Sequence, residues 1–398
     1  IAMQLLRKNT KLPHAASLLR KSIKSILKGV NSRDDTTTRL PVFVRINTLS
    51  TTMSKIIKRL AKTGVYTFLA YSTKGTSYET FLKTVRCLKP NEFVQDFHFP
   101  ELMLAFGAGS NLHDCSLLTS KKIMIQDKAS CIPALVLLSY AHLRKERGVT
   151  VLDACAAPGN KTTLLITGLS SSMSSKVIAL DRDTKRFKNL CANLRSFAEL
   201  GGYALSVNGD SVSKGKASEG HFCEIDAHCT DFLSLDPQNP AFSGLTAILL
   251  DPSCSSSGLH SRRPELAQEG RLPEERITRL SNLQAKLLRH ALSFPSVQLV
   301  VYSTCSVYEE ENEAVVCEQV AKFADDFRLL NIWQDQPALD LTSGSPQTPF
   351  IPRATWKTRG LGNDMSCCVR ANPEKDLTVG FFVACFKRRA RKPDVPSA

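Results

Sequence analysis

The chain has 398 residues, a net charge of +15 and a pI near 9.3, so it has room for two or three domains and a sizeable core. This charge suits a polyanionic partner such as a nucleic acid, although many proteins that bind none are also basic. Thirteen cysteines without zinc-like C-x-x-C pairs argue against a disulfide scaffold and a metal site, and indicate a reducing compartment. No apolar run reaches the ~18 residues of a membrane span.

The first 40 residues are basic and predict a helix. Apolar residues recur on one helical stripe between residues 11 and 30, with lysines and arginine among them. This helix either covers the next domain or contacts RNA, and the pattern leaves both open. The start lacks a signal-peptide core, and a chain that opens on Ile1 is expected to be a fragment.

Residues 41–125 predict a small α/β module made of short strands and a helix near residues 53–63. Four cations lie within that helix: Lys55, Lys58, Arg59 and Lys62.

From residue 126 onward, continuous apolar runs at 176–180, 245–250 and 297–301 predict buried parallel strands. Asp251 follows one run directly, and Cys254 and Cys305 stand just beyond the ends of two of them. Because open α/β sheets bind ligands outside the carboxyl ends of their strands, these side chains are expected to share one pocket. Alternatively, both cysteines are small buried hydrophobes, as most free cysteines are.

The segment 149–163 predicts a strand, a tight turn of small residues and the start of a helix. Its turn lacks the G-x-G-x-x-G spacing and the P-loop pattern, so neither a dinucleotide nor a nucleoside triphosphate is favoured. Asp181 ends the next predicted strand, one βαβ unit after Asp153, where an acid can hold ribose hydroxyls. A single solvated acid at a strand end is the alternative.

Together these segments resemble the NSUN-type (Nop/Sun, RsmB-like) RNA cytosine-5 methyltransferases over about residues 41–387. The resemblance implies an α/β fold, with a Rossmann-like S-adenosylmethionine-dependent methyltransferase domain at 126–387. A small α/β RNA-binding module at 41–125 and an N-terminal basic helical segment at 1–40 would precede it, and a basic tail at 388–398 would follow. The Val44 to Leu49 and Gln126 to Ser130 segments look like the family's first strand and its entry into the catalytic domain.

The same resemblance implies the site residues. Cys305, after Thr304, matches the motif that carries the family's nucleophile, and Cys254 matches the cysteine that assists product release. S-adenosyl-L-methionine is the implied cofactor, and the positions implied to bind it are Cys155, Ala156, Ala157, Pro158, Gly159, Asn160, Lys161, Asp181, Arg186, Asp231 and Asp251.

The chemistry explains why these residue types are needed. Carbon 5 of cytosine is too weak a nucleophile to take a methyl group, so a thiolate must first add to carbon 6. A free thiol has a pKa of about 8.5, so it needs nearby positive charge or hydrogen-bond donors to ionise at neutral pH. Lys161 is a candidate for supplying that charge. The Asp251 carboxyl group can bond to ring nitrogen 3 or the exocyclic amine of the base and stabilise the adduct.

Finer wording points to one subfamily. Asp-Pro-Ser-Cys at 251–254 and the segment 155–162 look closest to the fifth NSUN subfamily, which implies large-subunit ribosomal RNA as the partner and a location in the nucleus, within the nucleolus. We expect a monomer with no membrane and no metal. Ser256 stands where the family usually has glycine, so a positive φ there would strain the turn. An inserted-looking stretch at 209–220 blurs the alignment of Asp231.

Rival functions differ in testable ways. A DNA cytosine methyltransferase is disfavoured because those enzymes use only the cysteine that corresponds to Cys254, and an amino-group methyltransferase would use an Asp/Asn-Pro-Pro-aromatic loop. A transfer RNA substrate stays open. So does a non-catalytic ribosome-assembly factor that keeps the fold and binds RNA, although the intact Cys305, Cys254, Asp251 and Asp181 argue against lost activity.

Overall fold

A computed structural model describes residues 39–70, 75–141, 148–169, 175–213, 223–259, 270–334, 355–356 and 358–390. The N-terminal helix expected within residues 1–40 lies outside these ranges except for residues 39 and 40, and so do residues 391–398 of the expected basic tail. Residues 214–220 of the inserted-looking stretch also lie outside them, and so do residues 335–352, which belong to a segment from 334 to 352 whose prolines, serines and threonines predict a loop.

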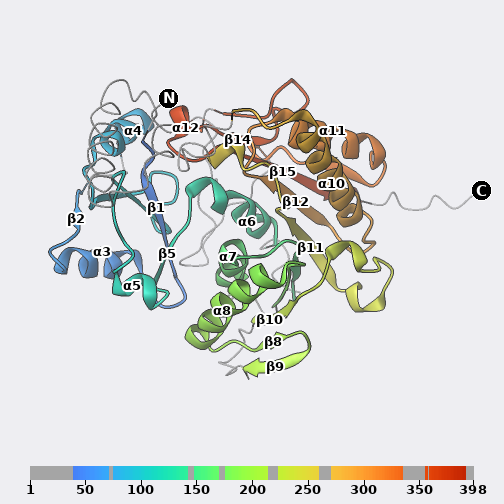
Figure 1. Cartoon of the computed structure of the whole chain (residues 1–398), viewed down its shortest axis with the longest axis horizontal. Helices are drawn as coiled ribbons and strands as arrows, with labels where there is room; N and C mark the ends of the chain where they lie inside the picture. Colours follow the sequence, from blue (N-terminus) through green and yellow to red (C-terminus); the bar gives the residue numbers. More distant parts are fainter. Residues whose placement is uncertain are drawn as a thin grey trace, which may run out of the picture. The chain divides into compact units, whose positions relative to one another are not determined.

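The first part of the described chain is a five-stranded sheet in the order β2-β3-β4-β1-β5 (Figure 1). Its strands are β1 (Val42–Ile46), β2 (Thr67–Phe68), β3 (Glu92–Gln95), β4 (Met103–Phe106) and β5 (Ile123–Ile125). All pairs are antiparallel except β2 with β3. The helices are α3 (Met53–Lys62), α4 (Tyr78–Cys87) and α5 (Ser116–Thr119). The amphipathic α3 buries Met53, Ile56 and Leu60 against this sheet and leaves its cations exposed.

The second sheet forms the larger part of the fold, in the order β13-β15-β12-β11-β6-β7-β10-β8-β9, with β14 paired to β15. Strands β6, β7, β10, β11 and β12 run parallel, whereas β15 is antiparallel to β12 and β13. Its strands are β6 (Thr150–Asp153), β7 (Ser175–Leu180), β8 (Leu205–Val207), β9 (Asp210–Ser213), β10 (Cys223–His228), β11 (Leu245–Leu250), β12 (Leu299–Thr304), β13 (Phe327–Leu329), β14 (Val369–Ala371) and β15 (Phe381–Arg388).

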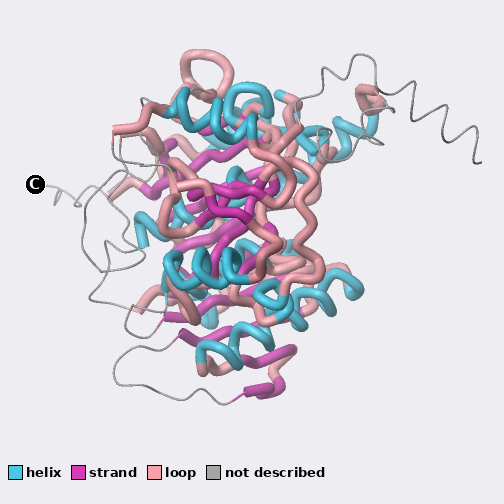
Figure 2. The backbone as a smooth tube through the Cα atoms, turned by 90° about the vertical axis from the view of Figure 1, so that its left-hand side faces the viewer, coloured by secondary structure: helices cyan, strands magenta, loops and turns pink. Residues whose placement is uncertain are grey.

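Helices cover both faces of this sheet (Figure 2). The helices are α6 (Lys128–Ala141), α7 (Asn160–Leu169), α8 (Thr184–Gly201), α10 (Glu274–Leu292), α11 (Glu313–Lys322) and α12 (Pro373–Asp376). Short 3-10 turns are η2 (Phe232–Ser234), η3 (Pro240–Phe242), η4 (Ser257–Leu259) and η5 (Glu309–Glu311). Helices α6, α7 and α8 contribute to one apolar core, and α10 and α11 contribute to the other. This is the Rossmann-like α/β fold that the sequence predicts.

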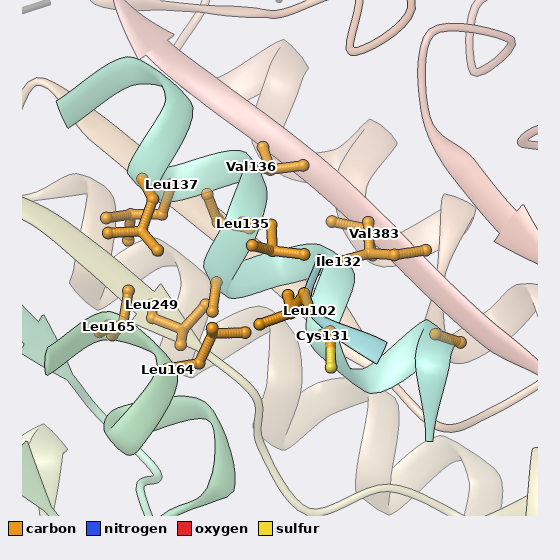
Figure 3. Packing of buried hydrophobic residues seen from close by; sticks show 14 of the residues in the cluster. Leu102, Cys131, Ile132, Leu135, Val136, Leu137, Leu164, Leu165, Leu249 and Val383 are labelled. Atoms are coloured by element: carbon orange, nitrogen blue, oxygen red, sulfur yellow. The ribbon is translucent and has the colours of Figure 1, made fainter. Parts of the chain in front are cut away.

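The core beneath α6 is continuous with the strands that lead to the site. Ile132 and Leu135 of α6 lie near Leu164 of α7, Leu249 of β11 and Val383 of β15 (Figure 3). All five side chains are fully buried. Their packing fixes α7, and therefore the loop before it, relative to the ends of the parallel strands.

Two buried cations join the small sheet to the larger domain. The Arg45 guanidinium, on β1, donates to the Asn160 carbonyl at 3.1 Å and to the Thr163 hydroxyl at 2.8 Å, both on α7. The ammonium of Lys128 lies 2.7 Å from the Asp96 carboxylate, and both side chains are completely buried. Breaking such a buried pair leaves an uncompensated charge, so the two sheets are expected to behave as one unit.

Two sequence expectations need adjustment. The strand expected at 297–301 is β12, which runs on to Thr304 and so ends directly before Cys305. The residues from 262 to 276 are polar and predict a turn-rich stretch, but α10 begins within it, at Glu274; residues 260–269 lie outside the described ranges.

Candidate active site

Four strands end at one edge of the larger sheet and present the residues that the sequence singled out. The chain order reverses at β6, which lies between β7 and β11. Asp153 ends β6, Asp181 follows β7, Asp251 follows β11 and Cys305 follows β12. A crevice outside such a switch point is where open α/β sheets bind ligands. The register also places Leu250 beside Tyr302, so the residues after β11 and β12 come together.

The two cysteines form a close pair. Their Sγ atoms lie 3.1 Å apart, although 51 positions separate them in the chain. The hydrogen bond from Cys254 holds the pKa of Cys305 below its ordinary value, against the opposing effects of burial and of the Asp251 charge. That same hydrogen bond, together with burial, raises the pKa of Cys254 well above its ordinary value. The pair therefore favours a thiolate on Cys305 and a thiol on Cys254.

A buried carboxylate fixes the loop that carries Cys254. Oε1 of Glu311 accepts hydrogen bonds from the Ser255 N–H and from the Gln284 amide, each at 2.9 Å. Gln284 also donates to the Ser253 carbonyl at 3.1 Å, and both Glu311 and Gln284 are fully buried. Neither residue stands out in the sequence, because helix α10 and turn η5 meet the loop only in the folded chain.

Asp251 is held by two donors. The Lys161 ammonium lies 2.6 Å from Oδ2, and the Ser303 hydroxyl donates to Oδ1 at 2.6 Å. Lys161 also donates to the Ser130 hydroxyl at 3.0 Å. Burial opposes the charged form of Lys161, but the Asp251 carboxylate outweighs burial and raises the pKa of the lysine. The lysine predicted to activate the thiol therefore bonds to Asp251, and its charge acts on Cys305 only as a weaker, more distant influence.

The small-residue loop after β6 wraps around Asp181. The Ala157 N–H donates to Oδ2 of Asp181 at 3.1 Å, and the Asp183 N–H donates to Oδ1 at 3.0 Å. Arg186 donates to the Ala157 carbonyl at 2.7 Å and lies 3.4 Å from the Asp181 carboxylate. Gly159 has φ +105°, a conformation that side chains rarely adopt, which explains a glycine at this turn.

A pocket opens beside this loop. Its wall combines acids and an arginine with apolar side chains, namely Ala154, Cys155, Asp181, Arg182, Arg186, Asp231, Phe232, Leu233, Ser253, Leu283 and Leu287. Asp231 is 43% exposed at its side chain and lies 3.8 Å from Arg182, so it stands at a polar rim. The pocket therefore brings Cys155, Asp181, Arg186 and Asp231 together, whereas Lys161 and Asp251 lie with the cysteines.

Family models match most of the chain. The model described as "16S rRNA methyltransferase RsmB/F" matches residues 140–387. The chain belongs to the RsmB/F methyltransferase family. A second model, the ferredoxin-like domain of "NOL1/NOP2/Sun domain family member 5", matches residues 40–126. The resemblance to the NSUN proteins, and to their fifth subfamily, is thereby confirmed.

Curated relatives of this RsmB/F family member agree. A mouse "28S rRNA (cytosine-C(5))-methyltransferase" is 37% identical over 90% of this chain, which spans 64% of the mouse protein. The Caenorhabditis elegans "26S rRNA (cytosine-C(5))-methyltransferase nsun-5" is 32% identical over 91% of this chain, which spans 71% of the worm protein. The Schizosaccharomyces pombe "25S rRNA (cytosine-C(5))-methyltransferase rcm1" is 32% identical over 94% of this chain, which spans 70% of the yeast protein. The chain thus spans about two thirds of the length of these relatives.

Solved structures support the same fold for this family member. A "Methyltransferase Homolog Protein" from Pyrococcus horikoshii has a TM-score of 0.54 at 21% identity, covering 88% of this chain and 87% of its own. The NSun6 protein of the same organism has a TM-score of 0.52 at 19% identity, with coverages of 88% and 92%.

None of the described helices combines the length and apolarity that crossing a bilayer requires. No group of three or more His, Cys, Asp or Glu side chains in the described ranges has a geometry that could hold a metal ion.

Proposed function

We propose that this chain transfers a methyl group from S-adenosylmethionine to carbon 5 of a cytosine in large-subunit ribosomal RNA. The observation that carries the proposal is the pair of sulfurs 3.1 Å apart at the sheet edge, one favoured as a thiolate and the other as a thiol. The family, and the ribosomal RNA named for its curated relatives, support this substrate class.

In the first step the Cys305 thiolate forms a bond to carbon 6, and the electron pair of the 5,6 double bond makes carbon 5 nucleophilic. A thiol whose pKa is lowered ionises more readily, so Cys305 depends less on a separate base. The role of Cys254 at this stage is to donate its S–H hydrogen bond to the thiolate.

Asp251 and Lys161 would orient and polarise the base. Lys161 and Ser303 occupy one oxygen each, so the carboxylate has a fixed direction and keeps free lone pairs for the exocyclic amine of cytosine. The Lys161 ammonium places positive charge where negative charge develops on the ring during addition. Preorganised charge of this kind is usually a large part of catalysis.

The pocket beside Asp181 fits the cofactor. Oδ1 of Asp181 accepts one recorded hydrogen bond and so keeps capacity for a ribose hydroxyl, while Phe232, Leu283 and Leu287 offer an apolar wall for a flat base. Arg186 would position the loop through Ala157, and Asp231 would contact the polar edge of the base. When bound, S-adenosylmethionine supplies the electrophilic methyl group.

Release requires loss of the carbon 5 proton and breakage of the bond between Cys305 and carbon 6. The largest cause of the high pKa of Cys254 is its hydrogen bond to Cys305. Once Cys305 is bonded to carbon 6 it no longer carries a negative charge, and that cause is gone. Burial still opposes ionisation of Cys254, but with that cause gone its thiol can pass its proton to solvent, and the thiolate can take the carbon 5 proton. The electron pair of the carbon 5–hydrogen bond then re-forms the 5,6 double bond, and the pair of the bond between carbon 6 and Cys305 returns to the sulfur.

We also propose that residues 41–125 bind RNA, that residues 126–387 perform the reaction, and that the protein acts as a monomer in the nucleus, within the nucleolus. The exposed cations of α3 support the first point, because neutralised phosphates drive RNA affinity.

Bisulfite sequencing of ribosomal RNA tests the whole proposal. RNA from cells with the protein should retain one cytosine that reads as converted in cells without it, and the Cys305→Ala protein should fail to restore it. Protection of a transfer RNA position instead would make that RNA the substrate. If neither RNA has a protected position, but cells without the protein assemble the large subunit poorly, a non-catalytic assembly factor would be favoured.

A further inference from the structure

Ser256 has a backbone conformation that serines seldom adopt. Its φ of 59° lies in the left-handed region, which glycine, asparagine and aspartate occupy far more readily. Such strain persists where surrounding contacts fix it, and it gathers at functional sites. The positive φ that the sequence analysis considered at this position is therefore present.

Contacts around Gly258 hold this turn against the second cysteine loop. The Gly258 N–H donates to the Cys305 carbonyl at 2.9 Å, and the Gly380 N–H donates to the Gly258 carbonyl at 2.9 Å. A side chain at position 258 would lie 2.0 Å from the Gly380 oxygen and 2.8 Å from the Cys305 oxygen. The backbone of Ser256 consequently has little freedom relative to Cys305.

The hydroxyl of Ser256 differs from those of its neighbours. Ser255, Ser257 and Ser306 bond to one another across the two loops at 3.0 to 3.1 Å. The Ser256 hydroxyl faces the reactive pair instead: its oxygen lies 3.7 Å from the Cys305 sulfur and accepts a hydrogen bond from the Cys305 thiol. Its backbone N–H bonds to the sulfur of Cys254.

We propose that Ser256 is a further catalytic residue, whose hydroxyl turns to donate a hydrogen bond to the sulfur when Cys305 is ionised. This inference rests on the proposed role of Cys305 as the nucleophile. The strained backbone is what carries the hydroxyl to the sulfur, and a glycine at this position would relieve the strain but offer no donor. The hydrogen bond from Ser256 acts in the same direction as that from Cys254, which lowers the pKa of Cys305.

Ser256 transfers no proton in this scheme. Its hydroxyl stabilises the negative charge on sulfur before attack and loses that partner when the bond between sulfur and carbon 6 forms. When that bond breaks, the electron pair returns to sulfur and the hydrogen bond forms again. The same donor therefore favours both the ionised nucleophile and its departure.

The test is alkylation of the free protein by iodoacetamide between pH 6 and 10, with the label on each cysteine peptide quantified by mass spectrometry. At pH 7 the rate at Cys305 should fall by roughly three- to tenfold in both Ser256→Ala and Ser256→Gly, and its pH profile should move upward. The exposed Cys87 and Cys317 are internal controls and should react equally in all three proteins.

The two variants separate the hydroxyl from the strain, because alanine keeps the strained φ and glycine relieves it. Wild-type rates at Cys305 in both variants, or a slower rate in only one, would overturn the proposal, since the hydroxyl is absent from both. The alkylation experiment contains no RNA and no S-adenosylmethionine, so its result does not depend on the outcome of the bisulfite experiment. Slower alkylation together with no methylated RNA would retain the hydrogen bond and reject the proposed function.

Discussion

The sulfur of Cys254 lies 3.1 Å from the sulfur of Cys305, and the hydrogen bond between them has opposite effects on the two pKa values. Each cysteine follows a different parallel strand, so the pair exists only because β11 and β12 are neighbours in the sheet. The asymmetry gives the two thiols different roles before any substrate arrives.

These roles predict different failures. Cys305→Ala should give neither a covalent adduct nor methylated RNA, because it removes the thiol that the pair favours as a thiolate. Cys254→Ala should still form the adduct but release it slowly, with turnover reduced by about 10²- to 10⁴-fold, the usual contribution of proton transfer. Denaturing gel electrophoresis with labelled RNA measures both, as a retarded band for Cys254→Ala and none for Cys305→Ala. The opposite pattern would make Cys254 the nucleophile.

The sequence predicted the meeting of Asp251, Cys254 and Cys305 because apolar runs identify parallel strands and parallel strands end at one edge. It could not predict that Ser303 would bond to Asp251. That contact depends on the register of β12 against β11, and the sequence offers no signal for a register within a fully buried sheet.

Arg45 illustrates a different limit. A charged residue within the apolar run of β1 signals a buried polar role, but two of its partners lie 115 and 118 positions away on α7. Glu311 is a similar case, because three consecutive acids at 309–311 look like a solvated turn, whereas the third is fully buried beneath the Cys254 loop. Long-range polar contacts of this kind need the folded chain.

Asp181 offers a test of the cofactor pocket. Asp181→Ala should weaken S-adenosylmethionine binding by roughly 10- to 100-fold, because a hydrogen bond to a charged group contributes about 1.5 to 3 kcal/mol. Isothermal titration calorimetry without RNA measures this affinity. Asp325→Ala is a suitable control, since it removes an exposed acid away from the pocket. Unchanged affinity in Asp181→Ala would reject the assignment.

The exposed face of α3 offers a test of the RNA-binding module. Replacing Lys55, Lys58, Arg59 and Lys62 with alanine should weaken RNA binding and make it less dependent on salt, with the slope of log K against log salt lower by about 0.7 for each lost phosphate contact. Filter binding between 50 and 300 mM salt measures the slope.

A matched control for this variant removes cations from another surface. Lys322 and Arg289 both pair with Glu318 on α11, so their double alanine variant should bind RNA like the wild type. If both variants lose affinity equally, the effect is one of total charge and α3 is not a specific contact.

Asp153 predicts a pH dependence of stability. Burial raises its pKa to about 7, against the hydrogen bonds from the Thr162 hydroxyl and the Cys155 backbone N–H. The unfolded chain releases this proton near pH 4, so between about pH 4 and 7 the folded state binds more protons and loses stability as the pH rises. Asp153→Asn cannot ionise, so it should gain stability relative to the wild type across that window, by up to a few kcal/mol at pH 8.

Urea unfolding of both proteins at pH 5 and pH 8 gives the comparison. The asparagine amide has a cost of its own that does not depend on pH. The informative quantity is therefore how much the difference in free energy of unfolding between the two proteins changes from pH 5 to pH 8. The same difference at both pH values would mean that Asp153 titrates normally.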